Sequence, residues 1–362
     1  MDDPKRRIAE TLRRIAEEEL LCSDQGPKNH EEDCALVTTT APLHLNQSQV
    51  QLFEWAKSDR VDAISELIAQ HRCNLNVQDN YNRTPLHFAA SSGNLATVKL
   101  LVQNNAVIDV TDKYGITPLL WSVYNNHKKV AVYLIESGAK YNKVTKQGQT
   151  IVHFVAESNA IGILKYLYQK YHLLEIDKKD NAGLTPFMVA AFRGNELLLE
   201  VFIRQKCHVL NRDKDSDGKS ALHYAIVENH QEVVRQLLSA CADPNVESNT
   251  MDAPIIEASR RGYHSCIDIL LSHGAQKDKR TKRGQTPLHL AVEQNRLETV
   301  EALLLAGAKL DPRDNDGLTP LEVAARASYT TLVDMIIKTD RWRQQYPVSV
   351  PITLPQLINV LH

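Results

Sequence analysis

The sequence predicts an all-α solenoid of about nine stacked helix-turn-helix units joined by short β-hairpin tips. A motif of the type Thr-Pro-Leu-His followed by small residues returns along the chain. Its eight copies begin at Thr84, Thr117, Thr150, Thr185, Ser220, Ala253, Thr286 and Thr319. The steps between them are 33, 33, 35, 35, 33, 33 and 33 residues. A period in this range indicates a stack of equal supersecondary units, each of which buries its apolar side against its neighbours.

One unit, Asn80 to Val110, shows how the residues build each element. Thr84 is expected to cap the first helix, because its hydroxyl can accept a free backbone N–H. Pro85 then falls at the first helical position, where its missing N–H costs nothing, and Gly93 ends the helix. A second helix follows, with a wide apolar face. Four motif histidines recur with the period, and we interpret them as structural hydrogen-bonding groups: His87, His153, His223 and His289.

The period and the Thr-Pro-Leu-His-x-Ala signature resemble those of ankyrin repeats. The resemblance covers roughly residues 50–340 and implies an ankyrin-repeat solenoid. Counting back 33 residues from Thr84 reaches Gln51, where helix-pair spacing persists without the motif. A capping unit is expected to diverge in this way, because its outer face meets water.

The expected organisation has four segments. Residues 1–22 form a charged helix that docks on the first unit, pairs with a partner helix or stays solvated. Residues 23–48 form a linker, 49–340 the repeat domain and 341–362 a proline-containing tail. For the end of that tail, LPQLINVLH, the alternatives are a docking peptide, a cover for the last unit, or the stub of a missing domain. The run before it resembles the junction in ankyrin repeat and death domain-containing proteins, although no death domain follows here.

Two units are longer by two residues, one near Tyr171 to Leu174 and one between Lys206 and Asp217. The second contains Asp213, Asp215 and Asp217, which superficially resemble a calcium loop. The closing Glu of such a loop is missing, since Tyr224 takes its place. We therefore expect a solvated, lengthened loop tip rather than a calcium site.

Composition narrows the function. The formal net charge of −2 gives no strong attraction to nucleic acid or membranes. The six cysteines show neither a C-x-x-C pair nor a zinc spacing, so we expect no metal and a reducing compartment, the cytoplasm or the nucleus. Phosphate-binding, dinucleotide-binding, nucleophile-elbow, zinc-protease and kinase motifs are all missing. We expect a monomer without a cofactor or enzymatic activity.

The family resemblance implies a concave protein-binding face, made of the hairpin tips and the exposed residues of the first helices. The tip positions include Tyr81, Arg83, Lys113 and Tyr114. The helix positions include Tyr124, Asn125, Phe192, Arg193, Arg260 and Arg261. Aromatic residues and arginines are common anchors of interfaces, although one or two of these side chains would instead pack against a neighbouring unit. The basic turn from Lys277 to Gly284 is either a solvated tip, a contact for an acidic partner or a nuclear-import signal.

These expectations favour an adaptor that binds another protein. The alternative is a regulatory module of a larger signalling protein of the death-domain type, whose effector domain is absent from this chain. The resemblance also implies a third role, as a substrate for asparagine hydroxylation at Asn76 and Asn245.

Overall fold

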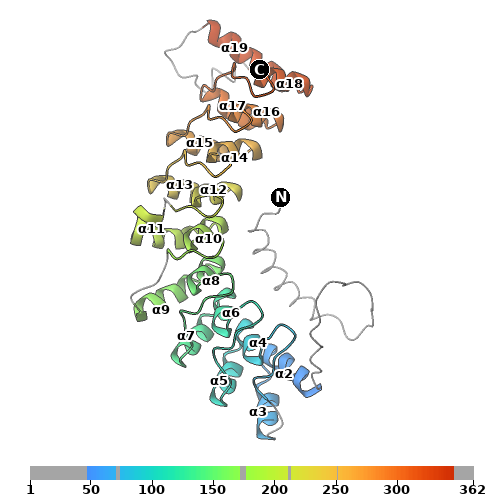
Figure 1. The fold of residues 1–362 in the computed structure, drawn as a ribbon, viewed down its shortest axis with the longest axis vertical. Helices are drawn as coiled ribbons and strands as arrows, with labels where there is room; N and C mark the ends of the chain where they lie inside the picture. Colours follow the sequence, from blue (N-terminus) through green and yellow to red (C-terminus); the bar gives the residue numbers. More distant parts are fainter. Residues whose placement is uncertain (1–46, 71–73, 172–176, 211–212, 251, 346–362) are drawn as a thin grey trace. The chain divides into compact units, whose positions relative to one another are not determined.

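The computed structural model describes residues 47–70, 74–171, 177–210, 213–250 and 252–345. These residues all lie in the second of two units into which the chain divides, Gln47–His362. They form eighteen helices and no strand, arranged as successive antiparallel pairs that follow one another in chain order (Figure 1). The expected all-α solenoid of ankyrin type is therefore confirmed.

The first helices of the pairs are mostly seven or eight residues long. They are α2 (Gln47–Lys57), α4 (Pro85–Ser91), α6 (Pro118–Tyr124), α8 (Ile151–Ser158), α10 (Pro186–Arg193), α12 (Ala221–Val227), α14 (Pro254–Arg261), α16 (Pro287–Glu293) and α18 (Pro320–Arg326). The second helices are α3 (Val61–Ala69), α5 (Leu95–Gln103), α7 (Lys128–Glu136), α9 (Ile161–Tyr171), α11 (Glu196–Leu210), α13 (Gln231–Ser239), α15 (His264–Ser272), α17 (Leu297–Leu305) and α19 (Thr330–Gln345).

In four of the eight motif units, a histidine joins the unit to the next. Thr84 caps α4, and its backbone N–H donates to Nδ1 of His87 over 3.0 Å. Nε2 of the same ring therefore carries the proton, and it donates to the carbonyl of Ile116 in the following unit over 3.2 Å. The same bridge recurs at His153, His223 and His289. The structural role predicted for these histidines is confirmed.

The tips between units are tight turns, five of them organised by an aspartate and three by Thr145, Ser248 or Thr281 in its place. Oδ1 of Asp112 accepts the backbone N–H groups of Tyr114 and Ile116 over 2.9 and 2.8 Å, and Gly115 supplies a φ of +83°. This explains the recurring D-x-x-G pattern, since only glycine adopts that conformation without strain. The expected β-hairpins do not form strands in the described residues. Each tip makes one backbone bond across its arms and one to the next tip, which is too short a ladder.

The first helices form one layer and the second helices another. Every first helix packs on the first helix of the next unit. In four units, the residue ten positions after the motif start reinforces this layer by reaching back to a carbonyl at the end of the preceding first helix; these residues are Asn94, His127, Asn195 and His230. Asn94 donates to Ala56 and Lys57, both over 2.8 Å, and His127 donates to Ser91 over 2.8 Å. These bonds satisfy carbonyls that a helix end would otherwise leave without partners.

Among the units before the last, the two longer ones have the longest second helices. Helix α11 has 15 residues and α9 has 11, whereas α5, α7 and α13 each have nine. The lengthened loop tip expected between Lys206 and Asp217 is therefore wrong: the helix runs to Leu210, and the turn from Asp215 to Lys219 keeps the ordinary aspartate-bonded form. The chain absorbs extra residues more readily as another helical turn, because each one gains a backbone hydrogen bond.

The predicted segments 1–22 and 23–48 lie outside the described residues, except for the last two positions of the linker, which belong to α2. Helix α19 continues to Gln345, five residues past the expected end of the repeat domain. Within this extension, Arg343 donates to the carbonyls of Leu304 and Ala308 over 2.9 and 2.8 Å. The end of α19 is thus fastened to the preceding unit.

Candidate protein-binding face

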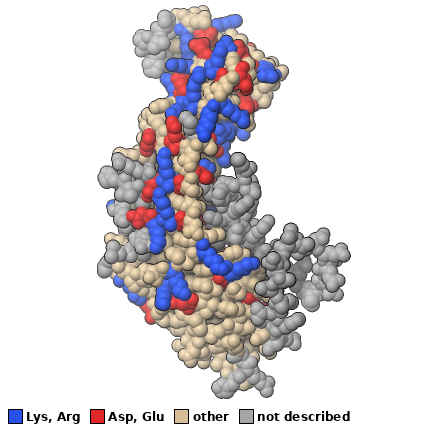
Figure 2. Space-filling model, viewed as in Figure 1, with Lys and Arg blue, Asp and Glu red and all other residues tan. Residues whose placement is uncertain are grey.

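The tip turns and the outward residues of the first helices make up what we call the tip face. All ten residues predicted to bind a partner belong to these two kinds of element. Figure 2 shows Lys, Arg, Asp and Glu gathered over the part of the stack that holds α14–α19, whereas other residues predominate over α2–α6 on the side in view. The surface on this side is therefore chemically uneven along the stack.

The structure brings three of the predicted residues together at two consecutive tips, the turns that precede α4 and α6. The ring of Tyr81 has the guanidinium of Arg83 at 5.1 Å from its centroid and Nζ of Lys113 at 5.8 Å. Arg83 also lies 4.6 Å from the ring centroid of Phe88 and pairs with Asp79 through Nε and Oδ2 over 2.8 Å. Tyr81 and Lys113 are exposed. This cluster presents an aromatic ring between two cations, held in place by cation–π attraction.

Tyr114 lies half-buried in the tip that precedes α6, and its carbonyl accepts the backbone N–H of Lys146 over 3.0 Å. The tips therefore repeat the same backbone geometry while carrying different side chains.

Tyr124 and Asn125 stand at the end of α6. The Tyr124 ring is half-buried and makes edge-to-face contacts with Trp121 (5.9 Å between centroids) and with Phe154 of the next unit (6.3 Å). Asn125 is exposed and donates to Oγ of Ser91 in the preceding unit over 3.0 Å. The expectation that some of these side chains pack against a neighbouring unit is confirmed for Tyr124.

Phe192 and Arg193 occupy the matching place at the end of α10, two units further on. Phe192 meets Tyr224 of the next unit edge to face at 6.1 Å. The Arg193 guanidinium lies 5.6 Å from the Phe192 ring centroid and forms an ion pair with Glu157 of the preceding unit. Because each side chain touches a different neighbour, their position depends on three consecutive units.

Arg260 and Arg261 end α14 and share one acidic partner. Arg260 donates to Oε2 of Glu257 over 2.6 Å and lies 3.6 Å from Asp252, and Arg261 also binds Glu257. Arg261 reaches the carbonyl of Val227 in the preceding unit over 3.1 Å. These arginines are separated from the aromatic part of the face by α12. The predicted residues therefore form several clusters rather than one patch.

The sequence analysis missed a second set of aromatic residues, four positions after the motif start in four of the eight units: Phe88, Trp121, Phe154 and Tyr224. Trp121 donates through Nε1 to Oδ2 of Asp112 over 3.1 Å, and the Tyr224 hydroxyl donates to Asp215 over 2.5 Å. Burial raises the pKa of Asp112, and the bonds from Ile116, Tyr114 and Trp121 oppose this rise. The sequence signal that could have revealed them is the recurrence of aromatic residues at this one motif position. Trp121 and Tyr224 thus anchor α6 and α12 to their own tips.

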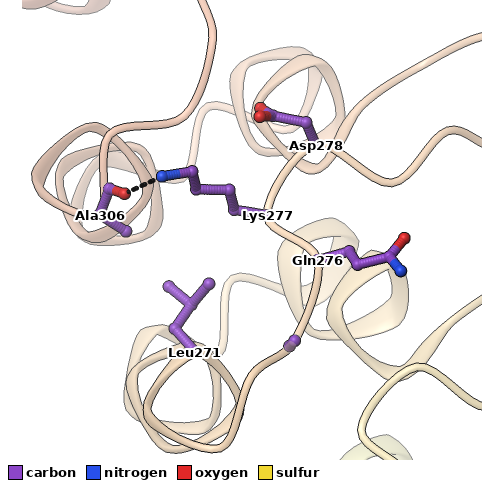
Figure 3. Close-up of a pocket in the computed structure, with 6 residues that line it drawn as sticks. Leu271, Gln276, Lys277, Asp278 and Ala306 are labelled. Atoms are coloured by element: carbon purple, nitrogen blue, oxygen red, sulfur yellow. Dashed lines mark hydrogen bonds between the residues drawn. The ribbon is translucent and has the colours of Figure 1, made fainter.

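The hollows on the described surface are shallow and lined by groups that the fold already uses. In the one drawn in Figure 3, Lys277 reaches across to the carbonyl of Ala306 over 2.7 Å. Its charge thus lies at the C-terminal end of α17, where a cation is favourable. Another hollow lies between Arg260 and Arg283 and also contains Asp252 and Glu293.

Part of the positive charge of the basic turn, Lys277 to Gly284, is paired within the fold. Lys279 pairs with Glu247 of the preceding unit, and Lys282 donates to the carbonyl of Asn249 over 3.2 Å. Arg280 and Arg283 remain exposed. Asp215, one of the three aspartates of the calcium-like run, is occupied by its own turn and by Tyr224. Across the described ranges no three His, Cys, Asp or Glu side chains are placed to hold a metal ion.

Both asparagines predicted as hydroxylation sites bond to the following unit. Oδ1 of Asn76 accepts the backbone N–H of Val107 over 2.8 Å. Oδ1 of Asn245 accepts that of Gln276 over 2.8 Å, while its Nδ2 donates to Gly274 over 3.1 Å. Their amides therefore help to fix the spacing of consecutive units.

None of the described helices combines the length and apolarity that a bilayer crossing needs. Among known proteins, a family model for three copies of the ankyrin repeat matches residues 52–145, 105–180, 152–249 and 255–344.

Several curated proteins are similar to parts of the chain. The potassium channel AKT2/3 of Arabidopsis thaliana is 31% identical over 127 residues, 34% of this chain and 15% of the channel. The palmitoyltransferase AKR1 of Lachancea kluyveri is 30% identical over 125 residues, 34% of this chain and 17% of that protein. The ankyrin repeat and SOCS box protein 16 of Mus musculus is 30% identical over 118 residues, 30% of this chain and 26% of that protein.

The match thus spans about a quarter or less of each of these relatives. They give no support to the closer resemblance to ankyrin repeat and death domain-containing proteins. The family model covers most of the chain, and it matches the same residues in which the motif, the tip turns and the histidine bridges recur. The chain belongs to the ankyrin repeat family, whose repeats are generally non-catalytic modules that bind other proteins.

Proposed function

We propose that this chain is a non-catalytic adaptor that binds another protein through the tip face. The observation that carries the proposal is the pair of half-buried rings, Tyr124 and Phe192, each held at the end of a first helix by an aromatic residue of the next unit. Aromatic and arginine side chains supply most of the binding energy in typical interfaces. Rings that are already fixed lose little conformational entropy when a partner binds.

The exposed residues around these rings extend the same surface. Tyr81 and Lys113 lie on it towards the N-terminal units, and Arg193 stacks on Phe192. Further along, α14 contributes arginines instead of rings. A partner that spans several units would therefore offer apolar groups to the aromatic part and carboxylates to the arginine part.

The test truncates exposed residues of the tip face, and thermal unfolding checks that the stack survives the loss of the Asn125 and Arg193 contacts between units. A tip-face variant carries Tyr81→Ala, Lys113→Ala, Asn125→Ala and Arg193→Ala, all at exposed positions. The control variant carries exposed second-helix substitutions: Gln103→Ala, Lys129→Ala, Lys165→Ala and Glu298→Ala. Each protein is used to capture partners from a cell lysate, with thermal unfolding as a check of the fold.

The proposal predicts that the tip-face variant loses partners that the parent and the control retain. A central anchor contributes about 2 kcal/mol or more, so removing several residues should reduce the affinity by well over about tenfold. If both variants capture the same proteins as the parent, and both unfold normally, the tip face is not the binding surface.

A second candidate is a regulatory ankyrin module of a larger signalling protein of the death-domain type. In the relatives the matched region is a minor part of a longer protein, which favours a module of a larger protein but gives no support to the death-domain type. A chain that stops after Gln345, where α19 ends, separates the two. A free adaptor keeps its partners after this truncation, whereas a tail that masks the repeats releases new ones.

Two further parts of the proposal concern the cell. We place the adaptor in the cytoplasm or the nucleus, because its cysteines show no paired spacing; imaging of the tagged full chain tests this. We also propose Asn76 and Asn245 as substrates of an asparagine hydroxylase. Intact mass after hydroxylase treatment, compared with an Asn76→Ala, Asn245→Ala variant, tests that assignment.

A further inference from the structure

The second helices differ along the stack in charge and in aromatic content. Helices α5, α7 and α9 contain five lysines and one acid, Glu136, which gives them a formal charge of +4. Helices α13, α15 and α17 contain four acids and one arginine, which gives a formal charge of −3 with histidine neutral. All four tyrosines of the second helices lie in α7 or α9. One stretch of this layer is therefore both basic and rich in tyrosine.

Contacts between units fix the rings of this stretch. Helices α5, α7 and α9 pack side by side (Figure 1). Nζ of Lys99 in α5 lies 5.7 Å from the ring centroid of Tyr133 in α7. The Tyr166 hydroxyl in α9 donates to Oε1 of Glu136 in α7 over 3.2 Å, so the one acid of these helices already has a partner. Each ring thus bridges to the preceding unit.

The end of α9 continues the same arrangement. Nζ of Lys170 lies 5.6 Å from the ring centroid of Tyr166 and 5.7 Å from that of Tyr171, and it donates to the Tyr166 hydroxyl over 3.3 Å. The Tyr171 ring stacks on Tyr141, in the turn after α7, with 3.9 Å between the centroids. We call six residues the tyrosine row: Lys99, Tyr133, Tyr141, Tyr166, Lys170 and Tyr171.

The tyrosine row combines fixed rings with accessible charges. Lys99 and Lys170 are exposed, and the four tyrosines are half-buried. Cation–π attraction holds each lysine near a ring, so each loses little conformational freedom when an anion binds to it. Tyrosine offers a large and rigid contact area with few rotatable bonds. These properties suit a partner that carries carboxylates beside apolar side chains.

We propose that the tyrosine row is a second docking surface, which binds an acidic segment of another protein. Carboxylates of the segment bind Lys99 and Lys170, and its apolar side chains pack on the exposed parts of the rings. Single-stranded nucleic acid fits this surface less well. Bases stack on open ring faces, whereas the two lysines and the stacked pair of tyrosines already lie over the rings. The row lies outside the tip face, so the proposal is independent of the function proposed above.

The experiment measures binding of a fluorescently labelled peptide in which glutamate alternates with leucine. The same peptide with lysine for glutamate and a single-stranded oligouridylate serve as comparison probes. The row variant carries Lys99→Gln and Lys170→Gln. The matched control carries Lys129→Gln and Lys165→Gln, which are exposed lysines of α7 and α9 outside the row. Lys165 has the same motif position as Lys99, but Val201 takes the place of the ring in the following unit.

Two further proteins complete the comparison. A ring variant, Tyr133→Leu with Tyr171→Leu, keeps apolar side chains but removes two of the four rings. Thermal unfolding checks its fold, and the lysine variants test the proposal independently if the ring variant is unstable. The tip-face variant described above is measured with the same peptide, and it should bind as the parent does.

The proposal predicts that the parent binds the glutamate peptide but not the lysine peptide. The row variant should weaken this binding by about fivefold or more, because two exposed charge pairs are lost, and the control should change it by less than about twofold. The ring variant, if folded, should weaken it as much as the row variant.

Four results would overturn the proposal. The first is a parent that does not bind the glutamate peptide. The second is an equal loss in the row variant and the control, because charge alone would then attract the peptide. The third is tighter binding of the oligouridylate that depends on the row, which would make the row a nucleic-acid surface. The fourth is a loss in the tip-face variant alone, which would place the peptide on the tip face.

Discussion

The motif histidines make the stack sensitive to acid. The His153 ring accepts the backbone N–H of Thr150 over 3.1 Å and donates to the carbonyl of Leu184 over 3.0 Å, so it bridges two units in its neutral form. Burial lowers the pKa of His153 from 6.5 to about 4, and burial does the same for His87 and His223. A second proton on the ring would both charge a buried group and remove the acceptor for Thr150.

The direction and the size of the effect of pH on stability follow from the pKa values of His153 in the unfolded and the folded chain. The unfolded chain binds the proton below about pH 6.5 and the folded chain only near pH 4, so the contribution of His153 is complete above pH 6.5 and is lost as the pH falls towards 4. The full difference corresponds to about 3 kcal/mol per histidine, of which about 2 kcal/mol is lost by pH 5.

The assay compares the parent with a His153→Gln variant, whose amide keeps a donor and an acceptor but does not titrate. Urea unfolding at pH 7.5 and at pH 5 should show the variant losing about 2 kcal/mol less than the parent between the two conditions. NMR titration of the ring protons should place the pKa of His153 near 4. A variant that weakens in acid as steeply as the parent, or a ring that titrates near 6.5, would refute the reasoning.

Three other predictions concern single contacts. Trp121→Phe removes the indole donor from a buried carboxylate and should lower the free energy of unfolding by about 1–3 kcal/mol in urea titrations; an unchanged midpoint would contradict this. Asn245→Ala removes two bonds between units and should cost about 1–2 kcal/mol in the same assay, whereas Asn142→Ala, at an exposed position, should cost almost nothing. Alkylation at pH 8, followed by mass spectrometry, should modify exposed Cys241 well before buried Cys266, because burial raises the pKa of the Cys266 thiol to about 11; equal rates would show that this part of the stack opens readily.

The sequence by itself determined the repeat, its register and the local structure of each unit. Thr84, Pro85 and His87 show why: the cap, the first helical residue and the ring that bonds the cap lie within four positions, so their geometry depends on nothing distant. The tip turns are equally local, since Asp112 bonds residues two and four positions later.

Only the tertiary structure decided which exposed residues are held and which are free. Tyr124, Phe192 and Arg193 are fixed by Phe154, Tyr224 and Glu157, partners 30 to 36 positions away. Those contacts exist only once neighbouring units are stacked, and no local pattern specifies which side chains then meet. The stack likewise decided that the extra residues near Lys206 lengthen α11 instead of its turn. Propensity and hydrogen bonding act within a unit, whereas the binding surface arises between units.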